Sequence, residues 1–189
     1  MALPQSKETE RTVFLRDIVH ATASQDVMGW PKPTEEDLAL FGRIIQFYCG
    51  IDFALRYTLD VMDRGGMLAS PWAGKTAKLN MYKTAQALRS SPIWNEGHRF
   101  AFDAIEEHRR VRNLVAHFVA RRFVSEDAYI FVTMSAADFE QVYGVQPDAD
   151  NMLFGVTDAA QMRGIIPELQ ALASWCSKLP GDLSGAKIR

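Results

Sequence analysis

The sequence predicts a mainly α-helical fold: a bundle of about four main helices, with a small β-hairpin-like insertion before the last helix. Apolar residues recur at helical spacing in three long stretches and one final stretch. Two short runs rich in β-branched and aromatic residues lie between the third and the last of these. The chain has 189 residues, 48% of them hydrophobic and 23% charged, so it can bury a full core without disulfides.

Residues 1–33 are expected to form an N-terminal arm with a short helix around Leu15–His20, because two prolines in the following MGWPKPT end it. Thr34 supplies an N-cap for the first long helix, and the acidic residues 35–37 suit its first turn. This helix is expected to end at Gly65–Gly66. A second helix follows over about 75–89.

The stretch from Pro92 to about Phe123 predicts a third long helix. The runs DAYIFVTM (127–134) and NMLFGV (151–156) predict two paired strands, so a β appendage is expected at about 124–156. Thr157 is expected to cap the last helix, in which Pro167 predicts a kink or a late start. We therefore expect one domain over 34–179 and a flexible tail over 180–189.

Charge and cysteine content exclude several classes of protein. Lys+Arg 21 against Asp+Glu 23 gives a net charge of -2, which excludes a general polycation that coats nucleic acid. Cys49 and Cys176 lie in apolar stretches and suit buried thiols better than a disulfide framework. Charged residues interrupt the N-terminal region, and no uncharged run approaches the length of a membrane span. The sequence thus favours a cytoplasmic protein.

One segment, RRVRNLVAHFVARR at 109–122, contains five arginines and no lysine or acidic residue. A solvated helix face would explain a charge run by itself. A guanidinium, however, binds phosphate oxygens bidentately, which a lysine does not. The segment therefore provides candidate substrate-binding residues, namely Arg109, Arg110, Arg121 and Arg122.

Helical geometry predicts which residues of this segment face the core and which face away from it. With Val111 at 0°, the expected core residues fall within about 60°, whereas Asn113 and His117 fall together at about 200–240°. The side chain of Arg112, at about 100°, is long enough to reach towards His117. The small residues Ala116 and Ala120 lie beside them. Such a face suits a phosphate-cleaving site or a tightly packed pair of helices.

The hexapeptide RNLVAH at 112–117 resembles the Arg-X4-6-His signature of the HEPN superfamily (higher eukaryotes and prokaryotes nucleotide-binding). The resemblance implies a helical bundle, usually dimeric, with paired motifs at the dimer interface. It also implies metal-independent endoribonuclease activity without a cofactor, in a toxin–antitoxin or phage-defence context. On this basis His117 would be the general acid/base for 2'-OH attack, Arg112 would stabilise the phosphorane, and Asn113 would orient both.

The sequence also fits two other functions. Some HEPN proteins only bind, so a non-catalytic dimeric module that binds RNA or a nucleotide, or acts as a scaffold, is the alternative. The arginine cluster would also suit a small-molecule nucleotide binder. The expected partners are RNA or a nucleotide, an antitoxin, and a second copy of the chain that docks through the face formed by Asn113, Ala116, His117 and Ala120.

Three further patterns are weaker signals. The GKT at 74–76 has P-loop spacing, but Ala69 replaces the first glycine and no strand is expected before it. His98 and His108 do not have the spacing of a helical zinc site, so no metal is expected. Trp94, Phe100 and Phe102 are expected in the core of the bundle.

Overall fold

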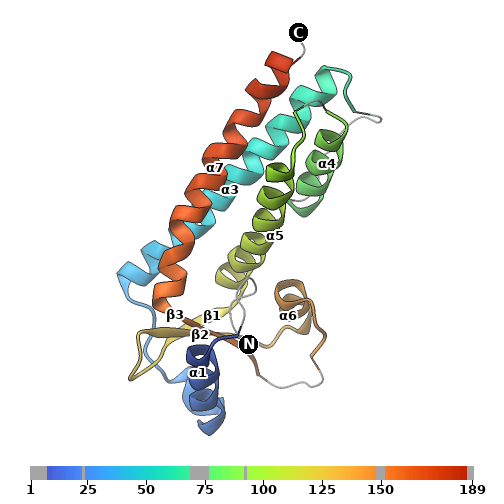
Figure 1. The fold of residues 1–189 in the computed structure, drawn as a ribbon. Helices are drawn as coiled ribbons and strands as arrows, with labels where there is room; N and C mark the ends of the chain where they lie inside the picture. The colour runs from blue at the N-terminus through green and yellow to red at the C-terminus, as the bar shows by residue number, and fades with distance from the viewer. Residues whose placement is uncertain (1–7, 23, 69–76, 92, 148–151, 187–189) are drawn as a thin grey trace. The chain divides into compact units, whose positions relative to one another are not determined.

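The computed structural model describes residues 8–22, 24–68, 77–91, 93–147 and 152–186, and it is mainly helical with a small sheet (Figure 1). The chain divides into two compact units. Unit 1 contains Met1–Ile45 and Arg110–Ile166, and unit 2 contains Gln46–Arg109 and Pro167–Arg189. The three long helices, α3 (Glu35–Arg64), α5 (Glu96–His117) and α7 (Ala159–Ala186), each contribute a segment to both units.

The sheet of unit 1 is antiparallel, with strand order β1 (Val119–Arg122), β2 (Ala128–Thr133) and β3 (Leu153–Asp158). The pairing of the two expected strands is confirmed, with Ile130 opposite Val156 in the register. The first strand was not expected, because its residues were assigned to the third helix. That helix instead ends at His117, and β1 pairs with β2 from Val119 opposite Val132. The expectation that the third helix reaches Phe123 is therefore wrong.

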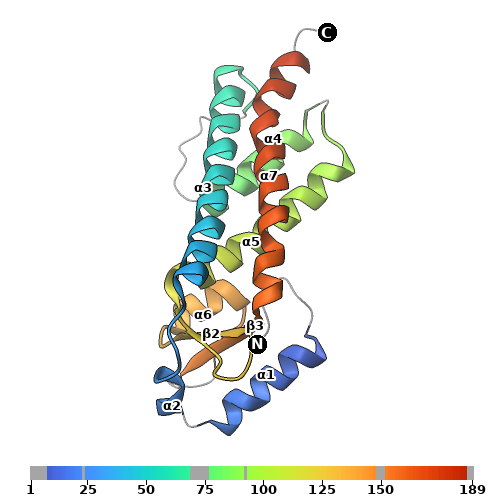
Figure 2. The same cartoon turned by 90° about the vertical axis from the view of Figure 1, so that its left-hand side faces the viewer.

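Three short helices complete unit 1. Helix α1 (Glu10–Ala21) begins at a capping box formed by Thr9 and Thr12, and it packs against β3 (Figure 2). Helix α2 (Ser24–Met28) follows it. Helix α6 (Ala136–Tyr143) is capped by Ser135 and ends at Gly144, whose φ of 74° favours glycine. One core cluster joins the arm to the sheet through Leu15, Val19, Val27, Phe123, Ala128, Ile130, Val132 and Val156.

Unit 2 is a bundle made of α4 (Ala77–Arg89) and segments of α3, α5 and α7. The hydroxyl of Thr84 on α4 donates to the carbonyl of Leu55 on α3 over 3.4 Å. The ring of Trp175 on α7 lies edge-on to His98 and Phe102 on α5, with centroid distances of 5.4 and 5.7 Å. Phe102 is buried as expected. Phe100 is 61% exposed, so its assignment to the core is wrong.

Helix α7 begins at Ala159, before Pro167, so the late start that Pro167 allowed is not observed. The carboxylate of Asp158, rather than Thr157, accepts the hydrogen bond of the first turn, from the amide of Ala160 over 2.8 Å. Thr157 lies in β3 instead. The helix continues through Pro167 and Pro180 to Ala186, into the range for which the sequence suggests a flexible tail.

Helix α3 is long and apolar enough to cross a membrane, when length and composition alone are considered. Its apolar residues also serve as core, because Phe41 and Ile44 are buried in unit 1 and Ile51 and Leu55 are buried in unit 2. The structure is compatible with a soluble protein.

Candidate functional site

The end of α5 holds the three residues expected to act in catalysis. Helix α5 begins after Asn95, whose carboxamide oxygen accepts from the amide of His98 over 3.2 Å. It ends at His117, where the amide of Phe118 donates to the carbonyl of Leu114 over 3.1 Å. The guanidinium of Arg112 donates from Nη1 to Oδ1 of Asn113 over 2.9 Å. Arg112 is therefore held by its neighbour rather than extended into solvent.

This hydrogen bond turns the guanidinium of Arg112 towards Asn113. Asn113 lies about 100° from Arg112 but only about 40° from His117 around the helix axis. The imidazole of His117 is exposed. An exposed histidine and a positioned cation are residue types that suit phosphate chemistry.

The structure corrects the expected orientation of Asn113. Its side chain is 4% exposed, not directed away from the core. The helical spacing of the sequence predicts a single core face around Val111. In this part of α5 the residues Val111, Asn113 and Leu114 are all buried, so the buried face is wider than a single apolar stripe. Asn113 is consequently a buried support for Arg112.

The first two arginines of the segment differ from Arg112 in their surroundings. Arg109 belongs to unit 2 and is buried, and its Nε and Nη2 donate to the carboxylate of Glu106 over 2.7 and 2.8 Å. The hydrogen bonds to Glu106 raise the pKa of Arg109. Arg110 belongs to unit 1 and is partly buried. A guanidinium already bound in a fork by a carboxylate offers little to a substrate phosphate.

The last two arginines lie in β1, not on the helix. Nε of Arg121 donates to the carbonyl of Met28 over 3.1 Å. Arg122 donates from Nη1 to both carboxylate oxygens of Asp37, over 2.7 and 2.8 Å, and from Nη2 to Asp127 over 2.7 Å. The hydrogen bond to Asp37 raises the pKa of Arg122. The structure therefore does not bring the five arginines together on one face.

The residues of the expected dimer face also separate. Ala116 and His117 are exposed at the end of α5, whereas Asn113 is buried. Ala120 lies in β1, where it pairs with Phe131. Helical spacing thus no longer relates Ala120 to the other three residues.

The sequence did not predict a buried polar network around Asp37 in unit 1. Asp37 shares a capping box with Thr34, because the Thr34 amide donates to its carboxylate over 2.7 Å and the Asp37 amide donates to Oγ1 of Thr34 over 3.2 Å. The hydroxyl of Tyr129, on β2, donates to the same carboxylate over 2.5 Å. Tyr129 is completely buried, and Asp37 is 5% exposed.

The electrostatics of this network follow from its hydrogen bonds. Burial disfavours the charged form of Asp37, but hydrogen bonds from Tyr129, Arg122 and Thr34 outweigh it and lower its pKa to about 2. Burial, followed by the hydrogen bond to Asp37, raises the pKa of the Tyr129 phenol. The spacing of Thr34 and Asp37 is a sequence signal for the capping box. No local signal identifies the partners Arg122 and Tyr129, which come from distant strands.

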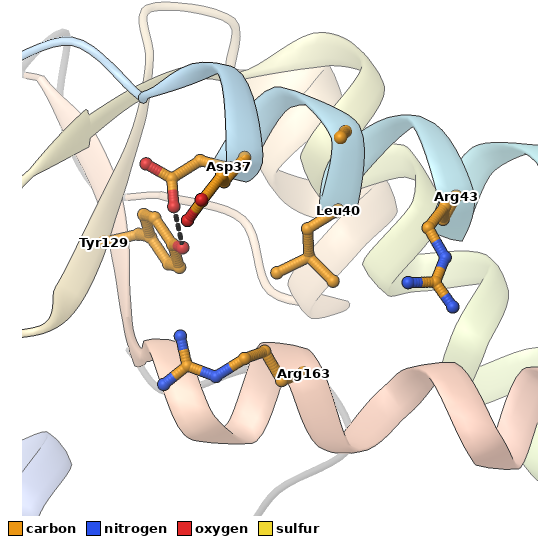
Figure 3. A pocket seen from close by; sticks show the side chains of 7 residues that line it. Asp37, Leu40, Arg43, Tyr129 and Arg163 are labelled. Carbon is orange, nitrogen blue, oxygen red and sulfur yellow. Dashed lines mark hydrogen bonds between the residues drawn. The ribbon is translucent and has the colours of Figure 1, made fainter.

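A pocket of about 310 Å³ adjoins the network (Figure 3). Figure 3 shows the side chain of Arg163 reaching towards Asp37 and Tyr129, with Leu40 between it and Arg43. The guanidinium of Arg163 donates from Nη2 to Asp127 over 2.8 Å. The residues that line the pocket all belong to unit 1: Glu36, Asp37, Ala39, Leu40, Arg43, Tyr129 and Arg163.

The remaining histidines of α5 are core residues of unit 2. Nε2 of His108 lies 3.2 Å from Oε2 of Glu168, and its buried Nδ1 has no hydrogen-bond partner within the described residues. Burial lowers the pKa of both His98 and His108. Over the described parts of the chain, no group of three or more His, Cys, Asp or Glu is arranged to hold a metal ion. The P-loop-like residues 69–76 lie outside the described residues.

Comparison of the chain with protein-family models, curated proteins and solved structures gives no match.

Proposed function

We propose that the protein is a metal-independent endoribonuclease of the HEPN type, acting in the cytoplasm with Arg112 and His117 as its catalytic residues. The observation that supports this function is the hydrogen bond from Arg112 to the buried amide of Asn113, which precedes the exposed His117 by about one helical turn. A cation held in place before the substrate binds stabilises developing charge without reorganisation. Histidine is the side chain that most often serves as a general acid or base, which is the role proposed here for His117.

The proposed reaction is cleavage by the neighbouring hydroxyl of the ribose. His117 accepts the proton of the 2'-OH as this oxygen attacks the phosphorus, and Arg112 stabilises the charge on the equatorial oxygens. The bond from phosphorus to the 5'-oxygen then breaks, and the leaving oxygen takes a proton from the imidazolium. The products are a 2',3'-cyclic phosphate and a 5'-hydroxyl, so neither water nor metal enters this step.

Asn113 acts in this scheme as a positioning residue. Its buried amide oxygen accepts from Arg112, and helical spacing puts it one turn from His117. The structural arginines Arg109 and Arg122 take no part, since their guanidiniums are bound by Glu106 and Asp37. This limits the phosphate contacts to few residues. We therefore expect RNA affinity to fall only moderately with salt.

The test is incubation of the purified protein with a mixed RNA pool in EDTA, followed by analysis of the ends. We expect 2',3'-cyclic phosphate termini, and a loss of at least about 10²-fold in rate for His117→Ala and for Arg112→Ala. His20→Ala and Arg99→Ala are the matched controls, because both residues are exposed and lie outside this site. Both controls are expected to cleave at the wild-type rate.

The same experiment distinguishes the alternative of a non-catalytic RNA- or nucleotide-binding module. Salt-dependent RNA binding that requires Arg112, without any cleavage, would support that alternative and overturn the nuclease. Cleavage that persists in His117→Ala would show that His117 is not the acid/base. A second copy of the chain would bring two such sites together through the exposed residues Ala116 and His117, as the HEPN resemblance implies.

A further inference from the structure

The pocket beside Asp37 combines a fixed polar wall with two side chains that remain open to a ligand. The fixed part is the network of Asp37, Asp127, Arg122 and Arg163, joined by four ion-paired hydrogen bonds of 2.7–2.8 Å from Arg122 and Arg163. Its two carboxylates and two guanidiniums balance, so the network is neutral at pH 7. A ligand in the pocket therefore meets a wall without net charge at this end.

The open part lies along α3. Glu36 and Arg43 are exposed and neither makes an ion pair with any residue that the structure describes. They are seven residues apart and so share one face of the helix, about 10 Å apart along its axis. Leu40 lies between them on that face, and Ala39 also lines the pocket (Figure 3). The apolar surface of Ala39 and Leu40 is thus bordered by Arg43 and Glu36. Neither charge is compensated by an ion pair within the described structure.

Arg163 adds further donors on the opposite side. Its Nη2 is taken by Asp127, but within the described structure its Nε and Nη1 make no hydrogen bond. Figure 3 shows Arg43 and Arg163 on either side of Leu40. An anionic group in this space would receive a charge-assisted hydrogen bond from Arg43 and further N–H groups from Arg163.

We propose that this pocket binds a small organic acid with one anionic group, whose carboxylate is held by Arg43 and whose apolar body lies on Ala39 and Leu40. The single charge follows from the balance above, because Arg43 is the only lining cation not already compensated by a carboxylate of the described structure. A second negative charge would find no further uncompensated cation in the lining, and the uncompensated carboxylate of Glu36 would repel it. The volume of about 310 Å³ is at the lower end for ligand pockets, which limits the ligand to a small molecule.

This proposal does not depend on the nuclease function, because no residue of the pocket belongs to the catalytic pair. The two are tested by different readouts, ligand binding and RNA cleavage. A negative result in one experiment therefore does not contradict the other proposal.

The experiment is calorimetric titration of the full chain with benzoate, benzyl alcohol and phenyl phosphate at neutral pH. Benzoate is expected to bind at one saturable site. Benzyl alcohol has the same ring without the charge, and phenyl phosphate has a second negative charge, so both are expected to bind about tenfold more weakly or worse. No saturable binding of benzoate, or tighter binding of phenyl phosphate than of benzoate, would overturn the proposal.

Two variants with opposite expected effects sharpen the test. Arg43→Gln is expected to weaken benzoate binding about tenfold, since it removes a charge-assisted hydrogen bond. Its matched control is Arg64→Gln, which removes an exposed arginine from the same helix outside the pocket. Glu36→Gln is expected to strengthen phenyl phosphate binding more than benzoate binding, because it removes the repelling carboxylate. Unchanged benzoate affinity in Arg43→Gln would place the ligand elsewhere and reject the site.

Discussion

The two ends of the arginine-rich segment differ from its middle in what their guanidiniums bind. Arg109 and Arg122 each have a carboxylate partner with low exposure, Glu106 and Asp37. Arg112 instead donates to a neutral amide, that of Asn113. The sequence shows five similar arginines without an acidic neighbour inside the segment, but acidic partners come from residues outside it. A run of arginines therefore indicates a phosphate site only at those arginines whose guanidiniums are not already paired with a carboxylate.

The largest expected effect on stability concerns the ion pair between Asp37 and Arg122, the last arginine of the segment. Asp37→Ala removes one of the two carboxylate partners of Arg122 and leaves the buried hydroxyl of Tyr129 without its acceptor, and should lower the free energy of unfolding by about 3–5 kcal/mol. Urea denaturation followed by circular dichroism measures this loss. The neighbouring exposed Glu36→Ala should change stability by no more than about 0.5 kcal/mol. If the two variants were equally stable, the Asp37 network would not hold unit 1 together.

A smaller difference in stability is expected between substitutions of Arg109, the first arginine of the segment, and Arg112, the middle one. Arg109→Ala removes a buried guanidinium together with its two hydrogen bonds to the carboxylate of Glu106, and should cost about 3 kcal/mol. Arg112→Ala removes one hydrogen bond to a neutral amide and should cost about 1 kcal/mol. Equilibrium unfolding in urea compares the two. The comparison fails if Arg112→Ala is the more destabilising substitution, because Arg112 would then be a structural residue like Arg109.

Much of the fold could be predicted from local patterns. The helical spacing of apolar residues predicted the long helices, and the β-branched and aromatic runs predicted two strands. The strand Val119–Arg122 was missed because FVARR continues the helical spacing of α5. Its strand state depends on the ladder with β2, where Ala120 pairs with Phe131. Such pairing is a tertiary effect that overrides local propensity.

The candidate site was predictable to a smaller extent. The motif predicts Arg112 and His117 as candidates, and the structure shows that Arg112 bonds its neighbour Asn113; the predicted reach of Arg112 towards His117 stays a prediction. The burial of Asn113 could not be predicted from one apolar stripe, because buried residues lie on more than one side of this part of α5. The Asp37 network joins residues 85 and 92 positions apart in the sequence, and no local pattern records such a pairing.

The smallest expected effect compares the two units on acidification. His98 and His108, both in unit 2, have pKa values lowered by burial, which outweighs the opposing charges of Asp182 and Glu168. Their neutral forms are favoured in the folded state, so the stability they contribute is present above about pH 6.5 and decreases as the pH falls below it. In unit 1 the pKa of Asp37 is lowered to about 2, so its contribution persists until the pH falls below about 4.

Unit 2 should therefore lose protection before unit 1 as the pH falls from about 6.5 to about 4. Hydrogen exchange with mass spectrometry, corrected for the intrinsic pH dependence, measures this in α4 and in β2. His108→Leu replaces the titrating group with an apolar side chain, and should make the protection of unit 2 less sensitive to acid. Earlier loss of protection in β2 than in α4 would mean that the Asp37 network, rather than the buried histidines, is the acid-sensitive part of the molecule.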